Sequence, residues 1–258
     1  YVYIRLTLHE AYPRLSIVKG TGHKGDLHLG PLPSRSAAQR VIDAIHSSVP
    51  LRRCTTRVSA RSMRDAPCTA AQLGVALCPC AGGVDPAEYA LIVDRAVRGL
   101  TVEPDLLLAP LMDRLAVLSA EERFEEAADV RDRAAALSSA LRRQRRFDLL
   151  RRAGRVRLEL PDGSGADLDS GRLVRAWGAG SRPEPDGSCD DALFAPGDTV
   201  SPLDRELADE LSCVAAWLDR CAHELTITHC EGELASSLPA VRSFTPRRTP
   251  VLSGARDH

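Results

Sequence analysis

The sequence predicts an α+β fold in which a central antiparallel helical hairpin is flanked by small β elements and by a segment that contains cysteines. Three observations predict it. Residues 106–146 have the apolar spacing of two consecutive helices, residues 1–7 and 155–178 contain strand-like alternation, and four of the eight cysteines fall within residues 54–80. No segment has the pattern of a single large sheet, so we expect small elements around the hairpin.

Length and charge limit the functions to be considered. The 258 residues are enough for one or two domains with real cores, and the net charge of -1 gives the whole chain no electrostatic signature of a nucleic-acid binder. The chain has no apolar stretch of about 18 residues and no basic segment followed by an apolar one. We therefore expect a cytoplasmic protein without a membrane partner.

The N-terminal part begins with a strand. Residues 1–7 have tyrosine at alternate positions 1 and 3, a pattern that favours a strand. Gly30 and Pro31 mark a turn, and residues 37–49 form a short predicted helix whose apolar residues are Val41, Ile42 and Ile45.

Two helices follow in residues 106–146. Apolar residues recur at spacings of three and four in the first helix, at Leu108, Leu111, Leu115 and Leu118. Ser119 is the expected N-cap of the second helix, and Glu122 would complete a capping box. The small side chains of Ala127, Ala128 and Ala134 predict close packing against the first helix. By periodicity alone, this pattern is also that of an ordinary structural hairpin without a binding function.

The end of the second predicted helix is rich in arginine. Residues 131–157 contain ten arginines against Asp132 and Asp148, so this stretch could neutralise several phosphates if it lies on one face. The candidate DNA-contacting residues are Arg142, Arg143, Arg145 and Arg146. A solvated helix end is the alternative. Only two basic residues are lysines, so arginine enrichment alone is not evidence for phosphate binding.

Four cysteines form a candidate metal site: Cys54, Cys68, Cys78 and Cys80. In a reducing compartment, thiolates at such density favour zinc or an iron–sulfur centre over disulfides. Their spacing, C-x13-C-x9-C-x-C, matches no standard zinc-finger pattern, and Pro79 restricts the turn that the last pair needs. Cysteines without a bound metal are therefore an open alternative.

The residues after 146 predict a small α+β unit. Strands are expected at 155–160 and 171–178, a loop at 181–198, a helix at 203–220, a strand at 224–229 and a disordered tail after 244. Four aspartates here, Asp167, Asp169, Asp190 and Asp191, lie in turn-like sequence, and we expect solvated loop residues rather than metal ligands.

One run in the second predicted helix carries a family resemblance. Residues 123–128, with the sequence Arg-Phe-Glu-Glu-Ala-Ala, together with Arg131-Asp132, resemble the UVR motif shared by the UvrB and UvrC proteins of bacterial nucleotide excision repair. The resemblance implies that the hairpin docks onto a UvrB-like partner. The implied contact residues are Phe124, as the apolar anchor, with Glu125, Ala127, Ala128, Arg131 and Asp132.

Upstream segments resemble the same family. Residues 1–15, 29–34 and 37–54 are similar to the part of UvrC that follows its GIY-YIG nuclease domain, so the resemblance covers about residues 1–146. It implies that the nuclease centre lies outside this chain, and no catalytic residue is assigned. UvrC proteins commonly carry four cysteines here, some holding a four-iron four-sulfur cluster, but their third cysteine would stand at Ala76, where this chain has Cys78 two residues later.

The C-terminal part resembles a different group more loosely. Residues 177–180 and 215–218 are similar to actinobacterial proteins that join a DnaQ-like exonuclease to a UvrC-like half.

The expected division of the chain is 1–34 (nuclease-domain tail and linker), 35–100 (helical and cysteine-containing), 101–146 (UVR hairpin), 147–244 (small α+β domain) and 245–258 (tail). Several functions remain open. The chain could be a UvrC-like repair protein that docks UvrB and contacts DNA, the UvrC-like part of an exonuclease fusion, or a non-catalytic interaction module. A nuclease using carboxylates within these residues is a further alternative.

Overall fold

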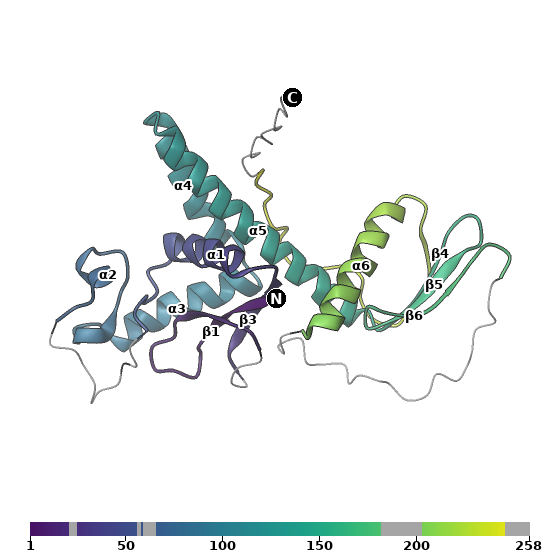
Figure 1. The fold of residues 1–258 in the computed structure, drawn as a ribbon, viewed down its shortest axis with the longest axis horizontal. Helices are drawn as coiled ribbons and strands as arrows, with labels where there is room; N and C mark the ends of the chain where they lie inside the picture. The colour runs from purple at the N-terminus through teal and green to yellow at the C-terminus, as the bar shows by residue number, and fades with distance from the viewer. Residues whose placement is uncertain (21–24, 56–57, 59–65, 182–202, 246–258) are drawn as a thin grey trace, which may run out of the picture.

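The computed structural model describes residues 1–20, 25–55, 58, 66–181 and 203–245, and Figure 1 shows their arrangement. Its helices and antiparallel sheets confirm the predicted α+β class. None of the helices in the described ranges is long and apolar enough to cross a membrane.

A three-stranded sheet opens the chain. Strand β1 (Val2–Leu6) lies between β2 (Leu15–Val18) and β3 (Leu27–Leu32), and both pairings are antiparallel. Helix α1 (Arg35–Ser48) begins where Ser34 Oγ accepts a hydrogen bond from the Ala37 amide at 3.1 Å. The apolar face of α1 packs in the same core as β1 and confirms the helix predicted at 37–49.

Two further helices complete this part. Helix α3 (Pro86–Thr101) is capped by the Asp85 side chain and has proline at its first position. Helix α4 (Asp105–Ala120) crosses it at a point where Gly99 faces Leu107. The absence of a side chain on Gly99 lets the two helices approach closely.

Helices α4 and α5 (Phe124–Arg152) form the predicted hairpin. Leu108, Leu111 and Leu118 of α4 share one core with the Ala134 stripe of α5. The predicted capping box is wrong. Ser119 lies inside α4, Glu122 adopts a left-handed φ of 58° in the connection, and α5 begins only after Arg123.

The C-terminal part is a four-stranded antiparallel sheet with one helix. Its strands are β4 (Arg155–Glu159), β5 (Gly165–Asp169), β6 (Arg172–Trp177) and β7 (Thr226–Cys230), in the order β6-β5-β4-β7, and α6 (Arg205–Cys221) packs against it. The expected loop positions of Asp167 and Asp169 are wrong, because both lie in β5. Asp190 and Asp191, and most of the loop expected at 181–198, fall outside the described residues.

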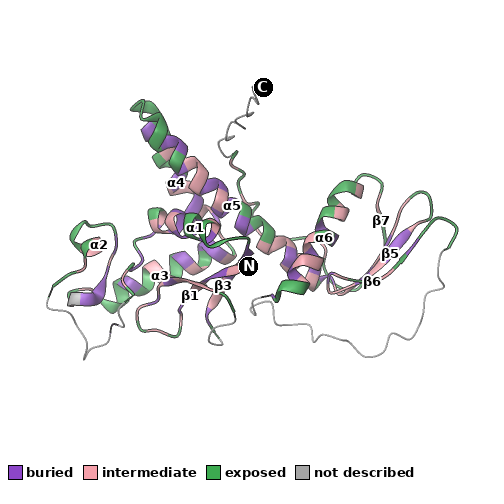
Figure 2. Cartoon of the chain, viewed as in Figure 1, coloured by how far each residue is buried: buried purple, intermediate pink, exposed green. Residues whose placement is uncertain are grey.

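Two hydrophobic cores meet along α5 (Figure 2). Leu141 belongs to the N-terminal core, whereas Phe147, less than two turns later, belongs to the core between α6 and the second sheet. After β7 the chain returns to the first core, where Phe244 packs. The tail expected after it lies outside the described residues from position 246 onward.

Candidate functional site

The four cysteines of the candidate metal site converge. The Sγ atoms of Cys54, Cys68, Cys78 and Cys80 all lie within 4.8 Å of one another, and the Cys54 and Cys78 Sγ atoms are 2.9 Å apart. Within the parts of the chain that the structure describes, these four are the one group of three or more such side chains close enough to share a metal ion.

Three separate segments bring these cysteines together. Cys54 follows α1, and Cys68 precedes the short helix α2 (Thr69–Gln72). Cys78 and Cys80 belong to the 3-10 turn η1 (Pro79–Ala81) and its N-cap, where proline stands at the first position. Pro79 was expected to hinder the pair, but its fixed φ suits the first position of a helical turn, so both thiols reach the same centre.

The candidate metal site is partly buried, and apolar side chains surround its sulfur atoms. Cys78 and Cys80 are 5% and 1% exposed, and Cys54 and Cys68 are half-buried. Val58 packs against the two buried cysteines. The Cys68 amide donates a hydrogen bond to Cys80 Sγ over 3.3 Å. A closed shell of this kind is typical of a structural metal site rather than a catalytic one, which keeps a coordination position open.

Burial changes the acidity of two of these thiols. It raises the pKa of Cys78, and the neighbouring Cys54 thiol adds to this. Burial also acts to raise the pKa of Cys68, but hydrogen bonds from the Ala71 amide, from the Cys78 and Cys80 thiols and from the Ala70 amide outweigh it, so the pKa of Cys68 is lowered. Buried thiolates without a cation are unfavourable, so a bound metal ion would supply the missing positive charge.

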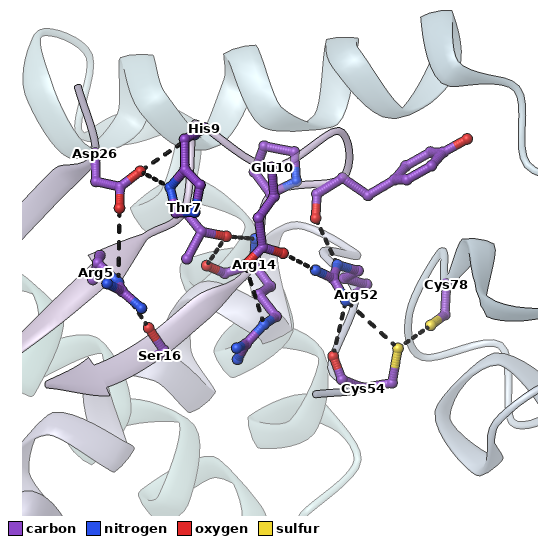
Figure 3. Close-up of polar contacts among 12 residues, drawn as sticks. Arg5, Thr7, His9, Glu10, Arg14, Ser16, Asp26, Arg52, Cys54 and Cys78 are labelled. Carbon is purple, nitrogen blue, oxygen red and sulfur yellow. Dashed lines mark hydrogen bonds and ion pairs between the residues drawn. The ribbon is translucent and has the colours of Figure 1, made fainter. Parts of the chain in front are cut away.

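A buried arginine lies beside the metal site (Figure 3). The Arg52 side chain is 1% exposed, and its guanidinium donates to the carbonyls of Tyr12 (2.6 Å) and Cys54 (3.2 Å) while pairing with Glu10. Its Nη1 also lies 3.9 Å from Cys54 Sγ. The Arg52 amide donates to the Tyr89 hydroxyl at 3.1 Å, so the cysteine loop is tied to α3.

Sequence patterns gave no signal for these supporting residues. Arg52 stands two residues before Cys54, but neither its burial nor its pairing with Glu10 can be read from one sequence. Tyr89 donates from its hydroxyl to the Pro13 carbonyl at 2.6 Å and stacks edge-on against Tyr12. These contacts join segments that are 40 to 76 residues apart.

A second polar network, also in Figure 3, fixes the first sheet. The Asp26 carboxylate is fully buried, and His9 Nδ1 lies 2.7 Å from it. Arg5 lies 3.8 Å from its other oxygen. Burial alone would raise the pKa of Asp26, but the hydrogen bonds from His9 lower it overall. The network links β1 and the turn after it to the residue that precedes β3.

The predicted docking residues divide into exposed and buried sets. Phe124 is 66% exposed at the start of α5, and Glu125 beside it is exposed. Ala127 and Ala128 are buried, and Arg131 and Asp132 are half-buried. The alanines therefore face other parts of this chain, and the surface that remains accessible is centred on Phe124.

The predicted DNA-contacting arginines also divide. Arg145 donates to the carbonyls of Thr101, Val102 and Pro239, so it holds the chain's own backbone. Arg146 donates to the Ala215 carbonyl at 2.8 Å and pairs with Asp219.

The other two arginines are more accessible. Arg142 and Arg143 are exposed, and Arg143 has a contact with the Pro31 carbonyl at 3.3 Å. All four arginines line a groove of about 1000 Å³ between α5, α6 and the segment that returns after β7.

Comparison with known proteins gives one family-level match. Residues 1–99 match the family model of the UvrC/Cho excinuclease middle domain. The UvrABC system protein C of Syntrophus aciditrophicus is 33% identical over 145 residues, 56% of this chain and 23% of that protein. The same protein of Salinispora tropica is 32% identical over 145 residues, 56% of this chain and 22% of that protein. No solved structure matches.

A longer match extends into the C-terminal part. A protein of Mycobacterium tuberculosis named "Putative bifunctional exonuclease/endonuclease protein MT2247" is 32% identical over 219 residues, 81% of this chain and 33% of that protein. The chain thus spans about a quarter to a third of the length of these relatives. The resemblance found in the sequence is confirmed, because residues 1–99 match the UvrC middle-domain model and the UvrC relatives are similar to the N-terminal half of the chain.

Proposed function

We propose that this chain is the UvrC-like part of a cytoplasmic protein of nucleotide excision repair, that it docks onto a UvrB-like protein and contacts DNA, and that the nuclease centre lies outside these residues. The observation that carries the docking proposal is Phe124. It is a large apolar side chain, 66% exposed, at the tip of a hairpin whose sequence resembles the UVR motif. Exposed aromatic residues of this kind are common anchors of protein interfaces.

Charge separates the two proposed contacts along the hairpin. The tip carries four exposed glutamates, Glu121, Glu122, Glu125 and Glu126, with Arg123 paired to two of them. The opposite end of α5 carries the arginines. An acidic tip repels DNA, so we assign the tip to a protein partner and the basic end to phosphates.

Within the basic end, Arg142 and Arg143 are the better DNA contacts. Their side chains are exposed, whereas Arg145 and Arg146 are held by backbone carbonyls and by Asp219. Exchanging Arg142 and Arg143 for glutamine should weaken DNA binding and reduce its dependence on salt, because fewer counterions are released.

Binding to a purified UvrB-like protein tests the docking proposal. Wild-type binding that is lost in Phe124→Ala, with folding intact, supports it. Val117→Ala is the matched control, because Val117 is 48% exposed on α4 of the same hairpin and lies outside the motif. Absence of wild-type binding, or equal loss in both variants, contradicts the proposal.

The UvrC-like part of an exonuclease fusion is the second candidate. The mycobacterial match favours it, because that match covers 81% of this chain while the UvrC relatives cover 56%. A protein in which these residues assist an exonuclease should bind DNA ends without a UvrB-like protein. A non-catalytic interaction module would bind the partner but not DNA, so the two binding assays together separate these functions.

The four cysteines supply the metal part of the proposal. The resemblance implies an iron–sulfur cluster at Cys54, Cys68, Cys78 and Cys80, and four converging thiols are a suitable donor set for a metal. Bound there, the metal would hold the cysteine loops together. Whether the four sulfur atoms can hold a single ion or a cluster depends on their spacing.

A further inference from the structure

The sulfur atoms of the metal site are close together. All four Sγ atoms lie within 4.8 Å of one another. A single tetrahedral zinc ion with bonds of about 2.3 Å places its ligand sulfurs about 3.8 Å apart. The arrangement therefore has the size of a site for one ion.

A four-iron four-sulfur cluster needs a wider cage. Each cysteine then binds a different iron atom at a corner of the cube, so two cysteine sulfurs are separated by the width of the cluster in addition to two outward bonds. The Cys54 and Cys78 Sγ atoms are 2.9 Å apart and would separate by about 1 Å to reach the spacing of a zinc tetrahedron, but much further to hold a cluster. The larger movement is opposed because Cys78 is buried and Cys54 is held beside Arg52. The donor set is suitable for a cluster, but its spacing is not.

The surroundings of the metal site also suit one tightly held ion. Cys78 and Cys80 approach it from the two sides of the turn at Pro79, which leaves little freedom to move them apart. The Cys68 amide and the Arg52 guanidinium both point N–H groups at ligand sulfurs, at 3.3 Å and 3.9 Å. Such donors reduce the excess negative charge of a metal with four thiolates.

We infer that Cys54, Cys68, Cys78 and Cys80 bind one divalent, tetrahedrally coordinated ion of the zinc class, rather than an iron–sulfur cluster. Four thiolates in a closed tetrahedron favour zinc. The inference rests on the proposed metal binding by these cysteines and is independent of the proposed docking to a UvrB-like protein.

Metal analysis of the full chain tests the inference. The chain is purified without oxygen from cells supplied with both iron and zinc, so that an iron–sulfur cluster would survive. We expect one zinc per chain, no acid-labile sulfide and no visible iron–sulfur absorption. Iron and sulfide in equal amounts, or a folded chain without bound metal, would overturn the inference. Binding to the UvrB-like protein is measured on the same sample, so the two proposals can fail separately.

Two further measurements locate the ion. Cys80→Ser should lose zinc, whereas Cys213→Ser, at an exposed cysteine on α6, should retain it. If Cys80→Ser does not fold, X-ray absorption at the zinc edge of the wild-type chain still decides, because four sulfur neighbours at about 2.3 Å are expected. Nitrogen or oxygen neighbours in place of sulfur would contradict the assignment.

Discussion

Arg157 of β4 and Asp167 of β5 stand directly opposite each other and form two hydrogen bonds of 2.7 and 2.8 Å between guanidinium and carboxylate. The Arg157 guanidinium also lies 5.5 Å from the centre of the Trp177 ring on β6. One arginine thus links three neighbouring strands. Both carboxylate oxygens of Asp167 are engaged in this pair, which is consistent with a structural role.

Removing this pair should destabilise the second sheet. Asp167→Asn should lower the free energy of unfolding by about 1 kcal/mol, because a bidentate pair across neighbouring strands loses its charge. Urea unfolding measures the change. Asp129→Asn is the control, because its pair with Arg133 is exposed and should contribute little. Equal effects of the two changes would contradict this role for Arg157.

Truncation of Phe124 and truncation of Leu137 should differ strongly in their effect on stability. Phe124→Ala should leave the free energy of unfolding nearly unchanged, because the side chain is 66% exposed, whereas Leu137→Ala should cost about 2–5 kcal/mol because Leu137 is fully buried. Thermal unfolding compares the two. Strong destabilisation by Phe124→Ala would mean that Phe124 belongs to the core and is not a free anchor.

Gly99→Ala should destabilise the chain although alanine favours helices. In an open helix the change would stabilise by about 1 kcal/mol. Here the added Cβ would lie 2.5 Å from Leu107 Cγ, which is fully buried, so we expect a net loss of about 1–3 kcal/mol. A double-mutant cycle with Leu107→Ala checks the cause, because the cost of the glycine change should shrink once the leucine is truncated.

Stability should fall in mild acid because of His46. Burial, with help from the nearby Arg53 charge, lowers the pKa of His46 to about 4. Between pH 6.5 and 4 the unfolded chain therefore binds a proton that the folded chain excludes, so stability present above pH 6.5 is lost as the pH falls toward 4, by an amount on the order of 3 kcal/mol.

His46→Gln separates this effect from other acid-sensitive groups. Urea unfolding at several pH values should give a flatter dependence for the variant in this window. Loss of a bound metal at low pH affects both proteins and cancels in the comparison. Parallel curves would show that His46 does not titrate as its burial predicts.

Local patterns predicted the hairpin well because its signals are local. Leu108, Leu111 and Leu118 repeat at helical spacing, and the helices form where that spacing occurs. The cap at Ser119 was wrong because α4 continues through it, and Glu122 makes the turn in a conformation that a glutamate seldom adopts. Strand β5 was missed because its two aspartates are unusual in a strand, and its pairing with β4 decides the structure.

The candidate metal site shows why the rest could not be predicted. The sequence identifies the four cysteines, but their convergence depends on the packing of Tyr12 and Tyr89 around Arg52. These two tyrosines lie 40 and 37 residues from Arg52 along the chain. The deciding contacts are long-range.

Helix α5 runs for 29 residues, from the first core into the second. An uninterrupted helix is rigid, so it fixes both the distance between the two cores and their relative rotation about the helix axis. Inserting one residue between Leu141 and Phe147 would turn the C-terminal sheet by about 100° and advance it by only about 1.5 Å. The walls that α5 and α6 give to the groove beside Arg142 would then no longer face each other, whereas the packing within each core would be affected less.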